Sequence, residues 1–552
     1  MAITDSHDTL PPSMDPRLAD AIETPPTDLA GILRRLGPGL IIAGSIVGSG
    51  ELIATTKTGA QAGISLLWLV IIGCVIKVFV QVELGRYAIT HGETTLSALD
   101  RVPGPRLVVN WIVWVWLIMM IFTVAQLGGI VGGVGQSLAL TMPIRGDYMQ
   151  AIALPSDKEV AHYLQWDKAF AEQDPSIEKL SPQQRARLQR GNELLRERLD
   201  QLGEPGTALV ERIRNGEKTP GVYTLDDKIW AAVATIVTGL LLYFGRYTLI
   251  QNLAMVLVVT FTFITIGNVV SLQWTNEYRI PLSEIFRGLS FGLPERVGDL
   301  RPLRTALATF GIIGVGATEL ITYPYWCLEK GYGKFTGPRT DDAAWAERAK
   351  GWLKVMRYDA FASMGVYTVA TMAFFLMGVA VLFREGRDPE GMRMVSTLAT
   401  AYVPVFGEYA RWLFLSGAVA VLYSTFLVAS AGNARMYADG LKVFGLMDRN
   451  NERTHERAVV GFSVLVPIVS LSVFCSGADP VKAILAAGIS QAVMLPILGI
   501  ASLYFRRTAT DARLKPTKLW DACLLASCLG LLIAGGWLAY NAGTDLLASL
   551  GS

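Results

Sequence analysis

Residues 44–51 read GSIVGSGE and lie within an otherwise apolar run at about 36–59. Glycine disfavours a helix by about 1 kcal/mol relative to alanine, and a carboxylate inside a membrane is costly and usually functional. A second apolar run, at about 303–330, is interrupted by GVGATELITYP at residues 314–324. Two interrupted spans in corresponding positions are typical of transporters whose broken helices form the binding site. The two stretches therefore predict an inverted repeat of five plus five helices, with helices 1 and 6 broken.

The composition excludes several classes of protein. Of the 552 residues, 51% are hydrophobic and 17% are charged, whereas soluble proteins carry about 25% charged residues. Forty-nine Lys and Arg residues against 47 Asp and Glu give no basic surface for nucleic acid. The five cysteines have no CxxC spacing, and the four histidines lie outside the apolar runs. We therefore expect an all-α membrane protein, not an enzyme, with no cofactor.

Eleven apolar runs are long enough to span a membrane. They lie at about 36–59, 64–90, 108–140, 228–245, 247–273, 303–330, 357–383, 409–440, 458–475, 480–505 and 518–541. Most Lys and Arg residues of the connecting loops share one side if the N-terminus is inside, although the loop between the fifth and sixth runs is an exception. The sequence thus predicts eleven spans, N-inside and C-outside, in the inner (plasma) membrane of a bacterium.

Four regions follow from this pattern. We expect a polar cytoplasmic tail at 1–33, spans 1–3 at 34–141, an extracytoplasmic helical insertion at 142–226, and spans 4–11 at 227–552. In the insertion, Ser181-Pro182 is typical of an N-cap and first helical position, and the helix should end near Gly203. Its apolar stripe comprises Leu188, Leu195, Leu199 and Leu202. The insertion either caps the outer face or acts as a docking or gating module.

Outside the two interruptions, several polar residues favour structural roles. Lys57, Lys77, Glu83 and Arg86 lie near the ends of spans 1 and 2, where they are expected to snorkel or form pairs. Gln126, Asn268 and Gln491 lie deeper, and a single amide in a span usually joins two helices. Glu319 has its own structural alternative, a carboxylate bonded to a neighbouring Thr or backbone group.

Several motifs resemble the NRAMP divalent-metal transporters. GPGL at 37–40 and GAQAGISLLW at 59–68 are similar to that family's GPGL…GAQ-x-G-x-SLLW. GAT at 316–318, YST at 423–425, SQ at 490–491 and LP at 495–496 are further points of likeness. The resemblance covers most of the chain outside 1–30 and 142–226. It implies a LeuT-type fold with eleven spans and alternating access.

The departures from the family concern the metal site. The family's Asp-Pro-Gly-Asn falls on Gly48-Ser49-Gly50-Glu51, and its Met-Pro-His falls either on 320–322 or on 323–325. The acidic residues of its third span correspond to Gln126 and Gly129. The soft sulfur ligand and most proton-coupling groups are therefore absent. If Glu51 and Glu319 face one cavity, they form an all-oxygen metal site for a hard cation, as in the NRAMP-related magnesium transporters that this sequence resembles.

The candidate substrate-binding residues are Gly48, Ser49, Gly50, Glu51, Gly316, Ala317, Thr318, Glu319, Thr322, Tyr323 and Gln491. The first hypothesis is a secondary transporter of a Mg²⁺-like divalent cation with weak or no proton coupling. The second is a transporter of a small anion such as bicarbonate, held by N–H groups at half-helix N-termini and coupled to Na⁺ or H⁺. The third is a membrane sensor whose ligand binds residues 142–226. The oligomeric state stays open.

Overall fold

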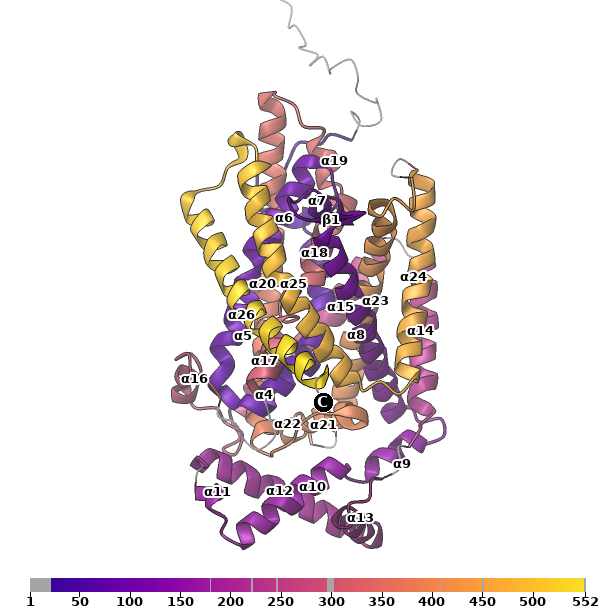
Figure 1. Ribbon diagram of the computed structural model, residues 1–552, viewed down its shortest axis with the longest axis vertical. Helices are drawn as coiled ribbons and strands as arrows, with labels where there is room; N and C mark the ends of the chain where they lie inside the picture. Colours follow the sequence, from indigo (N-terminus) through magenta and orange to yellow (C-terminus); the bar gives the residue numbers. More distant parts are fainter. Residues whose placement is uncertain are drawn as a thin grey trace, which may run out of the picture.

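The computed structural model describes residues 21–178, 180–219, 222–244, 247–294, 302–407, 409–448 and 451–550. Long helices stand side by side along the long axis of the molecule, and a group of shorter helices lies across one end (Figure 1). A short antiparallel hairpin pairs β1 (Arg106–Leu107) with β2 (Val109–Asn110) just before the third predicted span. Residues 1–20 of the predicted tail lie outside the described residues.

The helices of the first half and of the insertion follow in chain order. They are α2 Leu29–Arg35, α3 Pro38–Ile46, η1 Ser49–Thr55, α4 Thr56–Ala62, η2 Gly63–Leu66, α5 Leu67–Val75, α6 Lys77–His91, α7 Thr95–Asp100, α8 Trp111–Thr141, α9 Asp147–Ala153, α10 Asp157–Ala171, α11 Pro175–Glu178, α12 Pro182–Leu202, α13 Glu204–Arg214, α14 Asp226–Phe244 and α15 Tyr247–Leu272.

The second half continues in the same order. Its helices are α16 Leu282–Gly288, α17 Pro302–Phe310, α18 Ala317–Lys330, α19 Tyr332–Thr336, α20 Ala343–Met377, η3 Gly378–Phe383, η4 Gly391–Arg393, α21 Met394–Thr400, α22 Val403–Phe406, α23 Tyr409–Val443, α24 Glu452–Cys475, α25 Pro480–Thr508, η5 Ala512–Leu514 and α26 Lys518–Leu550. Among them α20 begins well before the predicted start at 357, because Trp345, Ala346 and Ala349 already bury one face of the helix.

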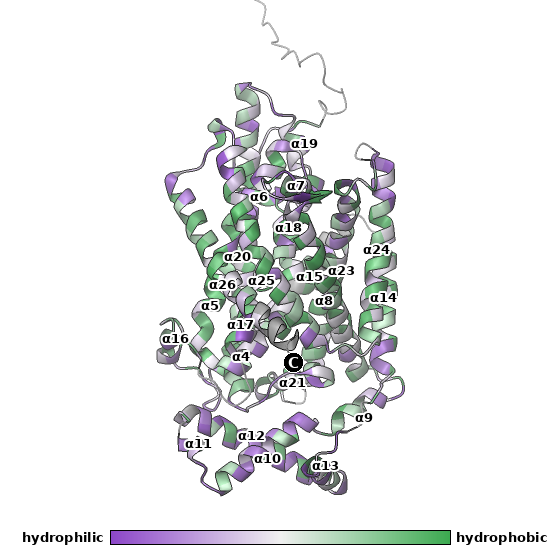
Figure 2. Cartoon of the chain, viewed as in Figure 1, coloured by the Kyte–Doolittle hydropathy of each residue, from purple (hydrophilic) through white to green (hydrophobic). Residues whose placement is uncertain are grey.

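Within the described residues, nine helices are long and apolar enough to cross a membrane. Apolar residues dominate the middle of these helices, and polar residues gather at the two ends and in the group of short helices (Figure 2). One of the nine, Pro38–His91, combines the first two predicted spans. The sixth predicted span is not among the nine, because it is divided into α17 and α18. The number of eleven spans and their orientation stay predictions.

Helix α8 is packed closely by its neighbours, because several glycines let other backbones approach it. A Cβ atom at Gly128 would lie 2.8 Å from the carbonyl oxygen of Ser470, and one at Gly135 would lie 2.1 Å from that of Asp227. Gly129 stands where the NRAMP resemblance implies an acidic residue. A Cβ atom there would lie 2.6 Å from the carbonyl oxygen of Pro480. Gly129 thus serves helix packing against the start of α25.

The insertion consists of α9–α13 and lies across one end of the bundle (Figure 1). Ser181 caps α12 in a capping box with Gln184, and the helix ends at Leu202 before Gly203, as predicted. Leu199 packs with Val160 of α10 and Leu209 of α13 in a small apolar core. The insertion therefore has its own packed interior.

Contacts with the bundle fix the insertion in place. Arg187 of α12 is buried, donates a hydrogen bond to the carbonyl oxygen of Gln61, and lies 4.6 Å above the ring of Phe383. Burial lowers the pKa of Arg187 to about 10, in spite of the nearby charge of Asp388. The Tyr148 hydroxyl donates to the carbonyl oxygen of Met392 at 2.5 Å. These contacts join the insertion to the ends of α4, η3 and η4.

Candidate functional site: the two helix breaks

The first predicted interruption is a break in the helix. Helix α3 ends at Ile46, Gly48 adopts an extended backbone, and the π-helix η1 begins at Ser49. Gly48 is required here for space, because a Cβ atom at this position would lie 1.6 Å from Oγ1 of Thr425. The break therefore lies directly against α23, and the chain continues as the short helix α4.

The second interruption is wider. Helix α17 ends at Phe310, the chain turns through residues 311–316, and α18 begins at Ala317. Gly314 has φ +57°, a conformation that favours glycine. A Cβ at Gly311 would lie 1.9 Å from the carbonyl oxygen of Gly488, so α25 packs directly on the turn. Both spans predicted to be broken are thus interrupted.

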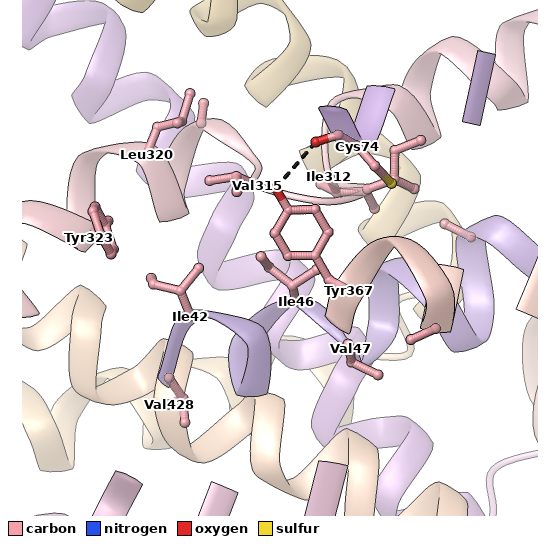
Figure 3. Packing of buried hydrophobic residues seen from close by; sticks show 14 of the residues in the cluster. Ile42, Ile46, Val47, Cys74, Ile312, Val315, Leu320, Tyr323, Tyr367 and Val428 are labelled. Carbon is pink, nitrogen blue, oxygen red and sulfur yellow. Dashed lines mark hydrogen bonds between the residues drawn. The ribbon is translucent and has the colours of Figure 1, made fainter. Parts of the chain in front are cut away.

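Buried apolar side chains surround the breaks. Ile46 and Val47 lie at the end of α3, and Ile312 and Val315 belong to the second turn (Figure 3). The Tyr367 hydroxyl reaches between them and donates a hydrogen bond of 3.2 Å to the carbonyl oxygen of Cys74. Polar groups inside this shell have few partners other than each other and the freed backbone.

A small cavity lies between the breaks and helices α8 and α23. Its volume of about 20 Å³ is enough for one water molecule or one ion of similar size. The lining residues are Ser45, Ile46, Ser49, Gly50, Thr123, Gln126, Leu127, Ile130, Ile312, Thr318, Glu319, Thr425 and Ala429. Four of the eleven predicted binding residues, Ser49, Gly50, Thr318 and Glu319, therefore line one space.

Glu319 provides a carboxylate to the cavity. It stands in the first turn of α18, and its Oε1 accepts a hydrogen bond of 3.3 Å from the hydroxyl of Ser45. The two residues come from opposite halves of the predicted repeat. Ser45 precedes the first break by three residues, so the contact joins the two interrupted spans across the cavity.

Gln491 connects three helices beside the cavity. Its Oε1 accepts the backbone N–H of Thr318 at 3.3 Å, and its Nε2 donates to Oε1 of Gln126 at 3.0 Å. Gln491 itself is buried, while Gln126 lines the cavity. The Gln491 amide thus accepts a backbone N–H at the N-terminus of α18. Gln126 and Gln491 join helices, as the interpretation of single amides in spans implies.

Glu51 does not line the cavity, although Gly50 does. Its side chain is fully buried, and Oε1 accepts hydrogen bonds from the backbone N–H of Gly314 at 3.3 Å and from the Thr371 hydroxyl at 3.1 Å. Within the described chain, Oε2 has no hydrogen-bond partner. A buried carboxylate with such an oxygen is expected to carry a proton or to face a cation. Contrary to the expectation, Glu51 and Glu319 do not face one cavity, because only Glu319 lines it.

The other predicted residues take positions around the site. Gly316 is the N-cap of α18, and a Cβ there would lie 2.5 Å from both Oε1 of Gln491 and Oε2 of Glu319. Thr322 donates to the carbonyl oxygen of Thr318 at 2.7 Å. The Tyr323 hydroxyl bonds to Asp359 at 3.1 Å, whose carboxylate caps the start of α3. Gly48, Gly316, Ala317, Thr322 and Tyr323 are absent from the cavity lining.

Lys77 is a functional candidate that the sequence reasoning missed. A position near the end of a span favours snorkelling or pairing with an acid, but the side chain is fully buried and bonds to backbone carbonyl oxygens of the second break. A charge inside a predicted apolar run is the signal that could have identified it. The expected ion pairs are present for Lys57, which lies 2.6 Å from Asp388, and for Arg86, which lies 3.1 Å from Glu83.

Two broken helices around a buried polar cavity define a membrane transporter of the alternating-access type. The chain belongs to the Natural resistance-associated macrophage protein-like (Nramp) family, whose model matches residues 221–540. No curated protein matches the sequence. Membership of this family, together with the long apolar helices, makes the protein an integral membrane protein and a secondary transporter of metal ions. Because this is a family of transporters, the prediction that the chain is not an enzyme is confirmed.

Solved structures agree on the fold. A mutant of the manganese transporter of Eremococcus coleocola is similar with a TM-score of 0.56 at 14% identity, over 93% of this chain and 88% of that one. The same transporter in complex with an aromatic bis-isothiourea compound gives a TM-score of 0.55 at 16% identity, over 96% and 93%. The predicted all-α LeuT-type fold is thereby confirmed.

Proposed function

We propose that the protein carries a hard divalent cation of the Mg²⁺ type through the cavity between the two helix breaks, with weak or no proton coupling. The chemistry of the lining carries this proposal. Hydroxyl, amide and carboxylate oxygens surround the space, and the described lining residues include no Met, Cys or His. Mg²⁺ prefers oxygen ligands and often keeps several waters beside one or two carboxylates.

The described lining of this cavity includes one carboxylate, that of Glu319, and not a cluster of acidic residues. Among the described residues, no three His, Cys, Asp or Glu side chains come together as metal ligands. A partly hydrated ion bound to Glu319, with Ser45, Ser49 and Thr318 nearby, requires no such cluster. The similar transporter of Eremococcus coleocola is described as a manganese transporter, which favours a divalent metal as the substrate class.

The surroundings disfavour the small-anion alternative. An anion would need free donors at the N-terminus of α18, but the Thr318 N–H is bonded to Gln491. The described lining includes no Lys, Arg or His, and the carboxylate of Glu319 would repel an anion. Coupling to Na⁺ or H⁺ would have to supply all of the compensating charge.

The amides beside the cavity support the proposal of weak proton coupling. Gln126 and Gln491 bond to each other at 3.0 Å. Amide side chains neither gain nor lose a proton near neutral pH. Gln126 stands where the resemblance implies an acidic residue, so the cavity lacks a titratable group at this position.

The experiment that tests the proposal is flux in proteoliposomes. Dyes inside the vesicles report Mg²⁺ and Mn²⁺, and a second dye reports internal pH with external bicarbonate present. We expect saturable Mg²⁺ entry that needs a higher Mg²⁺ concentration in Glu319→Gln and is accompanied by little acidification. Bicarbonate-dependent pH changes without metal entry would establish the anion alternative. Metal entry with stoichiometric acidification would contradict weak coupling.

The sensor alternative is tested by removing the insertion. Backbone N–H groups of Arg145 and Gly146 donate to the Asp226 carboxylate at 2.9 and 2.8 Å, so the ends of the insertion lie together. A short linker between these residues can therefore replace the helices α9–α13. A transporter should retain metal flux in this variant. Loss of ligand binding with no flux in either form would favour a sensor.

A further inference from the structure

Lys77 places a positive charge at the second helix break. It is the first residue of α6, its side chain has no exposed area, and Nζ donates to the carbonyl oxygens of Phe310 at 2.5 Å and Ile313 at 2.7 Å. The same ammonium lies 4.6 Å from the centre of the Phe310 ring, in the arrangement of a cation–π contact. Two carbonyls and an aromatic face thus surround one cation.

These carbonyls are acceptors that the break sets free. The carbonyls of Ala308 and Thr309 still accept the N–H groups of Gly311 and Ile312. Phe310 is the last residue of α17, and Ile313 lies in the turn, so both carbonyls need partners from elsewhere. The negative end of the helix dipole also points here. In transporters, half-helix C-termini and unwound carbonyls coordinate the coupling cation.

Two carboxylates lie near this position. The next residue after Ile313 is Gly314, whose N–H bonds to the Glu51 carboxylate. Glu319 also lies near the second break, in the first turn of α18. If all three groups are ionised, the breaks hold two negative charges and one positive charge. Removal of the ammonium would leave the buried carbonyls of Phe310 and Ile313 without this partner, which is expensive in an apolar interior.

We propose that the Lys77 ammonium is a tethered cation that occupies a cation-binding position made by the carbonyls of Phe310 and Ile313, so that transport requires no mobile cation there. The consequence for transport rests on the proposed function, whereas the occupation of the position does not. Lys77 is thus a positioning residue, which acts through the broken backbone of span 6 and not through contact with the substrate.

Two variants of Lys77 distinguish a cation position from simple space filling. Lys77→Ala removes the ammonium and opens room for a small ion. Lys77→Met removes the charge but fills the same space, so it serves as the matched control. A cation that binds only the folded state raises the unfolding temperature. We therefore measure thermal unfolding of purified protein in detergent with methylammonium, sodium or choline chloride at equal ionic strength.

We expect methylammonium or Na⁺ to raise the unfolding temperature of Lys77→Ala relative to choline, with no such difference in wild type or Lys77→Met. Equal responses of Lys77→Ala and Lys77→Met would overturn the proposal. This readout involves no substrate, so it stands even if the protein carries no divalent metal. A failure of wild type to take up Mg²⁺ or Mn²⁺ would overturn the proposed function alone.

Uptake supplies a second readout. Wild-type uptake should be the same in sodium and choline chloride, and a requirement for Na⁺ would overturn the proposal even if Lys77→Ala cannot be purified in folded form. Uptake by Lys77→Ala in choline should fall about tenfold or more, because buried groups lose their charged partner. Methylammonium should restore a substantial part of it, and Lys77→Met should stay inactive in every salt.

Discussion

The carboxylate of Glu51, three residues beyond Gly48, accepts a hydrogen bond of 3.3 Å from the backbone N–H of Gly314. This contact joins η1 to the turn that separates α17 from α18, and Thr371 of α20 bonds to the same oxygen. The two breaks are thus connected at two places, by Ser45 with Glu319 at the cavity and by Glu51 with Gly314 outside its lining. Polar contacts at two separate places therefore hold the two interrupted spans together.

The first prediction separates the two glutamates by kinetics. Glu319 lines the cavity, so Glu319→Gln should raise the substrate concentration for half-maximal uptake by about tenfold or more, since a charged contact contributes about 1.5–3 kcal/mol. Glu51→Gln should mainly lower the maximal rate, because it weakens the connection between the breaks. Initial uptake rates over a range of Mg²⁺ concentrations measure both. Equal effects of the two substitutions would refute the division of roles.

Much of the fold follows from the sequence because its signals are local. The glycines at 48 and 316 and the apolar runs around them predict broken spans, and the breaks occur at Val47–Gly48 and at 311–316. The cap at Ser181 is equally local and is present. Each of these features depends on residues within one turn of a helix, so one sequence is sufficient to find it.

The composition of the site is less predictable, because it depends on contacts far apart in the chain. Lys77 bonds to Phe310 and Ile313, which are more than two hundred residues away. Glu51 follows Gly50, yet only Gly50 lines the cavity. The π-helical turn at Ser49–Thr55 changes which side chains face the cavity, and helical periodicity cannot reveal that change. Pattern reasoning thus finds the breaks but not the orientation of the side chains beside them.

The second prediction concerns the space at the first break. Gly48→Ala should destabilise the protein by about 1–3 kcal/mol, because added atoms in a packed interior force neighbours to move, and Thr425 lies too close to the new Cβ. Gly365→Ala in α20 is the control, since a Cβ there meets nothing within 4 Å. Thermal unfolding in detergent compares the two variants. A similar unfolding temperature for both would show that the break can relax away from α23.

The third prediction compares two buried amides. Gln491→Leu removes partners from the Thr318 N–H and from Gln126, and each buried group left unpaired costs about 1–3 kcal/mol. Gln81→Leu is the matched control, because both amide atoms of Gln81 are buried without a hydrogen-bond partner in the described chain. We expect Gln491→Leu to lower stability and uptake and Gln81→Leu to leave both nearly unchanged. Comparable losses would mean that polarity alone, not this connection, is needed.

The fourth prediction is a pH dependence of the contact between the insertion and the bundle. Glu390 is bonded by Lys57 at 3.4 Å and by Lys158 of α10 at 3.2 Å. Burial raises the pKa of Glu390, but the two ammonium groups outweigh this effect and place the pKa below the usual value. A carboxylate with a lowered pKa in the folded state adds stability above its unfolded pKa. That stability is lost as the pH falls through the lowered value.

Glu390 should therefore hold the insertion at neutral pH and release it on acidification below the usual glutamate range. The measurement is hydrogen exchange of the α10 amides at pH 7 and at about pH 3.5, which is near or below the ordinary carboxyl pKa values. The rates are corrected for the intrinsic effect of pH on exchange. Protection of α10 should fall on acidification in the wild type, and Glu390→Gln should show less protection at pH 7 and a smaller difference between the two pH values. Lys168→Gln, which removes an exposed pair within α10, is the control and should behave as the wild type. An unchanged pH response in Glu390→Gln would assign the contact to Arg187 and Tyr148 instead.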